Sequence, residues 1–241
     1  MRVVFAFAIC TVLFLSGCSS RSNDEIQRSE LDNLYELSQT YLQAGRFADA
    51  ANLLSQINTR YPFGAYAQQV QLDLIYAQYK VGREDQALTV IDRFLSLNPN
   101  HGDNDYVRYM RGLVHLQAER AFFQDAFGVD RSDRNPVYAE RAYDDFAELI
   151  QRHPDSKYAA DARQRMVAIQ SRLAQHELAA AEYYLRREAY MAAARRGAYI
   201  LENFQSTVQV QRALEIMVTA YTELGLTQQA DDARAVLVAN F

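Results

Sequence analysis

The sequence contains few of the residues that break helices. Only 9 of its 241 residues are Gly and 4 are Pro, where average usage predicts roughly 17 and 12. An all-β sandwich or barrel needs a turn about every ten residues, so this supply argues against one. A collagen-like chain is excluded, while the 49% hydrophobic content is ample for a buried core. The composition therefore predicts a mostly helical chain.

Positive charge is also scarce. The chain has 25 Lys and Arg residues against 30 Asp and Glu residues, for a formal net charge of -5 at pH 7. A surface that neutralises phosphate groups needs the opposite sign, so nucleic acid is not an expected partner. The acidic balance itself names no partner.

The apolar run at the N-terminus lacks the length of a membrane span. Its 13 uncharged, largely apolar residues, 3–15, follow Arg2, whereas crossing a hydrocarbon core takes about 20 helical residues. The run fits a secretory signal and ends in Leu15-Ser16-Gly17-Cys18, which resembles a bacterial lipobox. We expect a lipoprotein signal peptide at 1–17 and an N-acyl and S-diacylglycerol lipid on Cys18. The alternative is an ordinary signal peptide with a chance cysteine.

Cysteine is nearly absent from the rest of the chain. Of the two cysteines, Cys10 leaves with the signal, so Cys18 is the only one in the mature protein. No intramolecular disulfide is then possible, although the periplasm is oxidising. By resemblance to lipoprotein sorting rules, Ser19 after the cysteine predicts the periplasmic face of the outer membrane. Residues 18–27 are then a lipid-anchored tether.

A repeat with a 37-residue spacing occupies the remaining sequence. Gly45 and Gly82 lie 37 positions apart, and stepping back 37 positions from Gly225 lands on Glu188. Five copies are marked by a small residue at the same phase: Ala50, Ala87, Ala142, Ala193 and Ala230. Three copies end in proline: Pro62, Pro99 and Pro154.

Each repeated position has a physical reason. Gly adopts the left-handed conformation that ends a helix without a Cβ penalty. The small Ala lets the second helix approach the first closely, and Pro stops the second helix. This is the tetratricopeptide (TPR) pattern, whose usual period is about 34 residues. It predicts an all-α fold, a TPR superhelix (α-solenoid) of about five helical hairpins.

Two copies carry extra residues. The first insertion, near 122–136, mixes aromatic and charged residues and is expected to be a loop pinned to the body. The second falls between Ser156 and Arg187, where no Gly or Pro occurs, so we expect one long helix there. The predicted sets are an N-terminal one of three repeats at 28–155 and a C-terminal one of two at 156–241, entered by the long helix.

Motifs that would carry catalysis are missing. The chain has no Gly-rich dinucleotide fingerprint, no phosphate-binding loop and no His-Glu-x-x-His. Its four histidines are scattered and have no carboxylates at metal-ligand spacing. We therefore expect no catalytic residues, no metal and no cofactor apart from the covalent lipid, and the protein is not expected to be an enzyme.

Aromatic and polar residues share one face of a predicted helix after the first repeat. Tyr66, Gln69, Asp73 and Tyr76 fall at i, i+3, i+7 and i+10, which are neighbouring positions on a helix surface. Aromatic rings, an amide and a carboxylate together suit an extended peptide in a groove. The alternative is that this face is only a polar exterior.

Several segments of the sequence resemble those of a known family. The lipobox and the segments at 60–64, 68–77, 91–94, 97–99, 109–113 and 127–134, the last reading FGVDRSDR, are similar to the BamD family, also called ComL or YfiO. Its members are lipoproteins of the β-barrel assembly (BAM) complex. The match runs from Cys18 almost to Phe241, and it departs by having Glu188 where a repeat Gly is common.

The resemblance implies a function in the assembly and insertion of β-barrel proteins into the outer membrane. The N-terminal repeats would bind the C-terminal β-signal of unfolded outer-membrane proteins, through Phe63, Tyr66, Gln69, Asp73 and Tyr76. The C-terminal repeats would dock on the POTRA region of BamA, beside other BAM lipoproteins, through Arg186, Arg187, Arg195 and Arg196.

Two alternatives stay open at this point. The arginines could form a solvated face with i,i+4 partners, such as Glu182 for Arg186. The protein as a whole could be another periplasmic TPR lipoprotein that scaffolds peptidoglycan or division enzymes.

Overall fold

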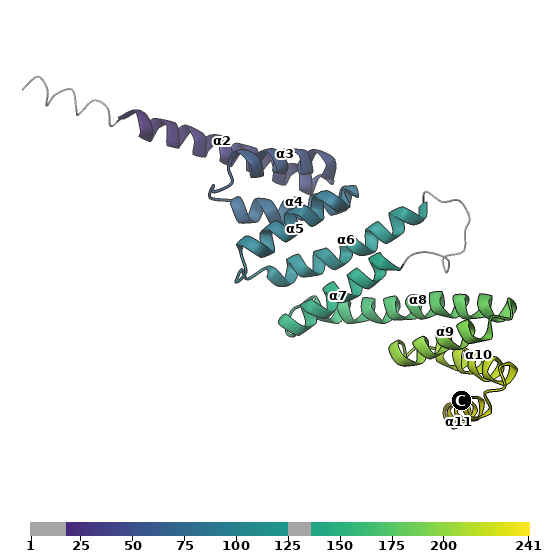
Figure 1. Cartoon of the computed structure of the whole chain (residues 1–241). Coiled ribbons are helices and arrows are strands. Elements are labelled where there is room, and N and C mark those ends of the chain that lie inside the picture. Colours follow the sequence, from purple (N-terminus) through teal and green to yellow (C-terminus); the bar gives the residue numbers. More distant parts are fainter. Residues whose placement is uncertain (1–17, 125–135) are drawn as a thin grey trace, which may run out of the picture. The chain divides into compact units, whose positions relative to one another are not determined.

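The computed structural model describes residues 18–124 and 136–241 (Figure 1). The signal peptide predicted at 1–17 and most of the loop predicted near 122–136 lie outside these residues. Every regular element in the described ranges is an α-helix. They are α2 (Cys18–Gln43), α3 (Phe47–Arg60), α4 (Ala67–Val81), α5 (Glu84–Leu97), α6 (Asn104–Gln124), α7 (Val137–Arg152), α8 (Ala159–Arg186), α9 (Tyr190–Asn203), α10 (Gln209–Glu223) and α11 (Thr227–Asn240).

Within each of two compact units, successive helices pack against one another, which confirms the all-helical, TPR-like fold class. One compact unit ends at Leu97. In this unit α3 packs against both α2 and α4, and α5 packs against α4. The other unit begins at Asn98 and holds the continuous series α6 to α11. The boundary expected between 28–155 and 156–241 falls inside this second unit, and that division of the repeats stays a prediction.

The repeat positions have the structural roles expected of them. Gly45, Gly82 and Gly225 take positive φ angles of 71°, 78° and 69°, the left-handed conformation that ends the first helix of a hairpin. The repeated alanines are all buried: Ala50, Ala87, Ala142, Ala193 and Ala230. The second helix of three hairpins ends two residues before a proline, at Arg60, Leu97 and Arg152.

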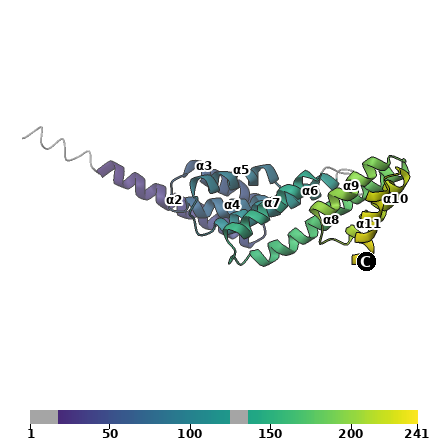
Figure 2. The same cartoon turned by 60° about the horizontal axis from the view of Figure 1, so that its bottom comes forward.

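The long helix expected between Ser156 and Arg187 is α8, with 28 residues. It packs against α7 as well as α9 and α10, and Figure 2 shows it running from the end of α7 to the α9–α10 pair. Its apolar face therefore enters two core clusters. Ala162 and Ile169 join the cluster with α6 and α7, and Ala174, Leu178 and Ala181 join the cluster with α9 and α10.

The tether expected at 18–27 is part of a helix, since α2 begins at Cys18. Leu31 of α2 is buried against α3 and α4, together with Leu54 and Leu74. Leu31 thus ties α2 to the rest of this unit.

The strained residue of the fold is Glu188. Its φ of 58° makes it the one non-glycine with positive φ in the described ranges. The left-handed conformation costs a residue with a Cβ about 1–2 kcal/mol. Replacement by Gly removes this cost but adds about 0.5–1 kcal/mol of backbone entropy lost on folding. Glu188→Gly is therefore expected to stabilise the fold by about 0.5–1 kcal/mol and to raise Tm by about 1–4 °C in calorimetry.

Arg187 supplies the matched control for this substitution, because its φ is -89°. Arg187→Gly is expected to lower Tm. A lower Tm for Glu188→Gly would mean that the turn is not strained.

Candidate functional site

The polar face predicted on α4 is shared with α2. Asp73 Oδ1 accepts a hydrogen bond from Gln69 Nε2 at 2.9 Å. Asp73 Oδ2 accepts two more, from Gln39 Nε2 at 2.7 Å and from the Tyr35 hydroxyl at 3.0 Å. The carboxylate thus joins α4 to α2, and three donors fix its orientation. Asp73 is half-buried and has a structural role, while peptide binding by this face stays a prediction.

A stack of two tyrosines lies beside this carboxylate. Tyr66 occupies the N-cap position of α4, and its ring stacks on Tyr35 with centroids 4.5 Å apart and planes 11° apart. A hydrogen bond to Asp32 raises the pKa of Tyr66, and partial burial next to Asp73 raises the pKa of Tyr35. Both phenols therefore stay protonated at physiological pH and act as donors to carboxylates.

The other two predicted residues lie apart from this cluster. Phe63, in the turn before α4, is 97% exposed. Tyr76 is 38% exposed and meets Phe47 of α3 edge to face, at 5.7 Å between centroids. The structure thus gathers Tyr66, Gln69 and Asp73, places the ring of Tyr76 against Phe47 of α3, and presents Phe63 to solvent.

Sequence reasoning missed the contribution of α2, namely Tyr35 and Gln39. The available signal was the repeat itself, since these residues precede Asp73 by 38 and 34 positions. Residues about one repeat apart occupy similar positions on the equivalent helices of successive repeats, here α2 and α4, where they become neighbours.

The four arginines predicted to form an interface lie near the α8–α9 turn. Arg186 ends α8 and Arg187 follows it, while Arg195 and Arg196 lie in α9, and all four are exposed. Arg196 Nη1 bonds Glu177 Oε2 of α8 at 2.7 Å. Glu177 is only 8% exposed, so Arg196 neutralises a buried carboxylate as well as facing solvent.

The proposed helical pair between Glu182 and Arg186 is absent. Glu182 instead pairs with Arg212 of α10, at 3.2 Å, and Arg186 has no ion pair among residues 18–124 and 136–241. The i,i+4 alternative is therefore wrong for this pair.

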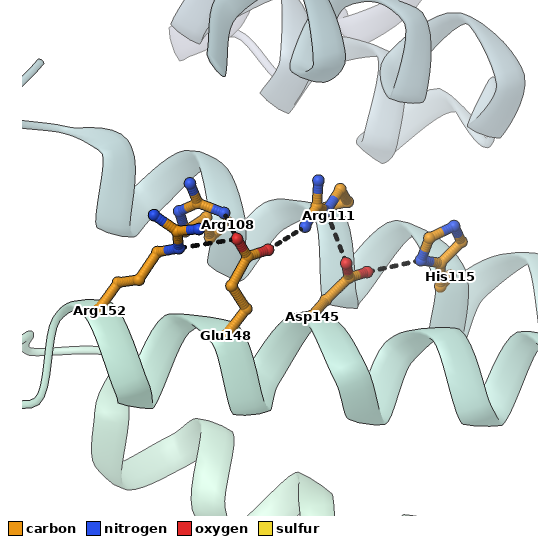
Figure 3. Close-up of polar contacts among 6 residues, drawn as sticks. All are labelled: Arg108, Arg111, His115, Asp145, Glu148 and Arg152. Carbon is orange, nitrogen blue, oxygen red and sulfur yellow. Dashed lines mark hydrogen bonds and ion pairs between the residues drawn. The ribbon is translucent and has the colours of Figure 1, made fainter. Parts of the chain in front are cut away.

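A second polar network ties α6 to α7, which no sequence motif had indicated (Figure 3). The carboxylate of Asp145 on α7 contacts two side chains of α6. Its Oδ1 lies 2.6 Å from Arg111 Nε, and its Oδ2 lies 2.6 Å from His115 Nδ1. Glu148, one turn further along α7, forms ion pairs with Arg108 and Arg111, each at 2.6 Å between nitrogen and oxygen, and with Arg152 at 2.8 Å. Three guanidinium groups thus surround two carboxylates.

The surroundings of this network are tightly packed. Asp145 and His115 are buried, and a Cβ added at Gly112 of α6 would lie 2.5 Å from the Phe146 ring of α7. Partial burial raises the pKa of Glu148. The positive charges of Arg108, Arg111 and Arg152 outweigh this effect, so the pKa lies below its ordinary value. The ion pairs therefore stabilise the fold only while Glu148 is ionised.

Two further properties concern membranes and metals. Among the described residues, no helix is both long and apolar enough to span a bilayer. The same ranges contain no group of three His, Cys, Asp or Glu residues placed to hold a metal ion. Cys18, the predicted lipidation site, is the first residue of α2.

Comparison with known proteins identifies the family. Residues 27–237 match the YfiO family, described as outer membrane lipoprotein. The chain belongs to this family. It is 44% identical to the outer membrane protein assembly factor BamD of Vibrio cholerae, over 94% of this chain and 93% of that protein. The BamD of Neisseria meningitidis serogroup A is 40% identical over 95% and 88%, and that of Haemophilus influenzae 35% over 100% and 92%.

Membership of the YfiO family confirms several expectations. The chain is an outer membrane lipoprotein, and its family is one of assembly factors rather than enzymes. Among solved structures, it is similar to a tetratricopeptide repeat protein of Parabacteroides merdae, with 14% identity and a TM-score of 0.41 over 88% of this chain and 80% of that one.

The α6–α7 network predicts a pH-dependent contribution to stability. Because the pKa of Glu148 is depressed in the folded state, its stabilisation is present above the unfolded pKa and is lost as pH falls through the folded pKa. Glu148→Gln should therefore destabilise the chain at pH 7 by about 2 kcal/mol, or about 4–8 °C in Tm. The difference from wild type should shrink steadily between pH 5 and pH 3.

Exposed Glu202 of α9 provides the control. Glu202→Gln is expected to leave Tm unchanged across this range. A wild-type advantage over Glu148→Gln that stays constant down to pH 3 would contradict the assigned role of Glu148.

Proposed function

We propose that this chain is a BAM subunit that assists assembly and insertion of β-barrel proteins in the outer membrane. The observation that carries the proposal is the near full-length similarity to BamD proteins, at 44% identity over 94% of the chain. The helical hairpins supply binding faces for protein partners.

The anchor is the lipid on Cys18. Each buried CH₂ group contributes about 0.8 kcal/mol to membrane binding, so several acyl chains hold the protein stably at the periplasmic face of the outer membrane. The α2 helix begins at this residue, and Leu31 of the same helix is buried. The anchor therefore lies at the start of the helix that packs on α3 and α4 through Leu31.

The substrate-binding part is the α2–α4 face. The tyrosine stack and the Asp73 hydrogen bonds hold Tyr66 and Gln69 in fixed positions. Phe63 and Tyr76 present exposed rings on either side along the sequence. Rigid aromatic groups beside oriented amides suit an extended segment of an unfolded barrel protein, such as its C-terminal β-signal.

The BamA-binding part is the arginine surface of α8 and α9. Arg186, Arg187 and Arg195 are exposed, and Arg196 keeps a 44% exposed side chain while pairing with Glu177. Guanidinium groups favour bidentate contacts with carboxylates, so an acidic edge of the BamA POTRA region is the expected partner.

The proposal is tested by affinity purification of the lipidated protein from detergent-solubilised outer membranes. BamA and the other BAM lipoproteins should copurify at moderate salt. Recovery of murein synthases or division enzymes in their place would contradict the proposed function.

The α2–α4 face makes a specific prediction about substrate contacts. Photocrosslinking residues at Phe63 and Tyr76 should capture an unfolded outer-membrane protein, because both side chains are exposed. A crosslinker at Val208, which is 83% exposed in the turn before α10, is the control and should capture at least fivefold less. Equal capture at all three positions, read from gels, would contradict the assignment.

The arginine surface makes a separate prediction. Arg195→Glu should weaken copurification of BamA at least tenfold, about 1.4 kcal/mol, without changing Tm, because Arg195 has no ion pair in the described part of the chain. Arg196→Glu should also lower Tm, since it places a second carboxylate beside buried Glu177.

Exposed Arg163 of α8 serves as the matched control. Arg163→Glu should retain BamA. If Arg195→Glu and Arg163→Glu retain BamA equally, the interface lies elsewhere.

A further inference from the structure

The turn between α8 and α9 repeats the geometry of the glycine turns. In those turns the left-handed residue donates its N–H to the carbonyl three positions earlier, and the next residue donates to the carbonyl five positions earlier. The N–H of Glu188 likewise bonds the Leu185 carbonyl at 3.0 Å. That of Ala189 bonds the Tyr184 carbonyl at 2.9 Å. The turn therefore requires a left-handed residue at position 188, and glycine would supply it without strain.

The backbone of such a turn does not need a side chain. A Cβ added at Gly45 or Gly225 would meet no atom within 4 Å, so a side chain there neither clashes nor packs. What Glu188 costs the fold is its backbone conformation, with φ at 58°. A strained residue that persists where glycine would fit points to a role for its side chain.

The Glu188 carboxylate has no partner within the described chain. Its side chain is exposed, and it forms no hydrogen bond or ion pair among residues 18–124 and 136–241. Arg186 and Arg187 precede it directly, yet neither of them forms an ion pair in these ranges. By contrast, Glu177 and Glu182 of α8 each pair with an arginine of another helix. Glu188 therefore does not serve the fold as these two carboxylates do.

A second carboxylate acts at the same turn. Partial burial raises the pKa of Tyr190, and the carboxylates of Glu223 and Glu188 raise it further. Glu223 is the last residue of α10 and is exposed. Two carboxylates from different elements thus act on the Tyr190 hydroxyl, and a negative site adjoins the arginine surface.

This mixture of charges makes the arginine surface selective. A partner edge that carried only carboxylates would be repelled by Glu188, whereas an edge that also carried a cation would pair with both signs. Such complementary patterns fix the register of an interface and disfavour other partners. The same stretch presents Tyr183 and Met191, which are 52% and 45% exposed, and both residue types are enriched in protein interfaces.

We propose that Glu188 is a specificity-determining contact of the arginine surface and pairs with a Lys or Arg side chain of the protein that docks there. The inference rests on the proposed function, under which this protein is BamA. A carboxylate that is exposed in the free chain and enclosed at an interface interacts more strongly with a facing cation once water is excluded. Binding then offsets the strain that the free chain carries at this turn.

The test measures the Kd of the detergent-solubilised lipoprotein for purified BamA by biolayer interferometry at moderate salt. Two substitutions separate charge from strain. Glu188→Gln removes the charge and keeps a side chain on the left-handed residue, whereas Glu188→Gly removes both. Each should weaken binding by about fivefold or more, while only Glu188→Gly should raise Tm.

Glu202→Gln is the matched control, because Glu202 is an exposed carboxylate near the other end of α9. It should change the Kd by less than about twofold. Glu188→Lys, which reverses the charge, should weaken binding more than Glu188→Gln does, and the difference between these two variants should shrink at high salt.

A wild-type Kd for Glu188→Gln would overturn the proposal. Tighter binding by this variant would also overturn it, since the carboxylate would then repel the partner. Weaker binding by Glu188→Gly alone would mean that the backbone, and not the charge, carries the effect, which again contradicts the proposal. Failure of the wild type to bind BamA would instead count against the proposed function, and with it against BamA as the occupant of this surface.

Discussion

Close approach of the two helices in each hairpin is the constraint on which the other features depend. The repeated alanines, from Ala50 in α3 to Ala230 in α11, are buried between helices. A methyl group holds the helices near enough for larger apolar residues on the same face to interlock. Gly112 has the same effect between α6 and α7, where a Cβ would meet the Phe146 ring. This spacing fixes which side chains of successive helices face each other.

Polar contacts then set the orientation of the packed helices. Tyr35 and Asp73 join α2 to α4, Arg111 and Asp145 join α6 to α7, and Glu177 and Arg196 join α8 to α9. Each contact combines a charge with a hydrogen bond in a partly buried setting, where it favours one arrangement over others. The same contacts hold aromatic rings and guanidinium groups at the surface, so packing and recognition share side chains.

The sequence was sufficient for the fold because its signals are local. Gly45, Gly82 and Gly225 mark turns by their left-handed conformation, and the stretch without Gly or Pro predicts α8. The segments that resemble the BamD family, such as 127–134, also indicated the family correctly. Contacts between residues about one repeat apart were harder to predict from the sequence. The contacts of Tyr35 with Asp73 and of Arg111 with Asp145 depend on which helix faces meet after folding. Nothing in the spacing of Arg196 showed that it would neutralise Glu177.

Hydrogen–deuterium exchange on the full-length lipoprotein, with and without an unfolded outer-membrane protein, tests the central claim that the α2–α4 face binds substrate. The account predicts slower exchange in the second half of α2 and at the start of α4, because bound chain would cover these segments. It predicts no change in α11. Unchanged exchange at both segments, with substrate bound, would contradict it.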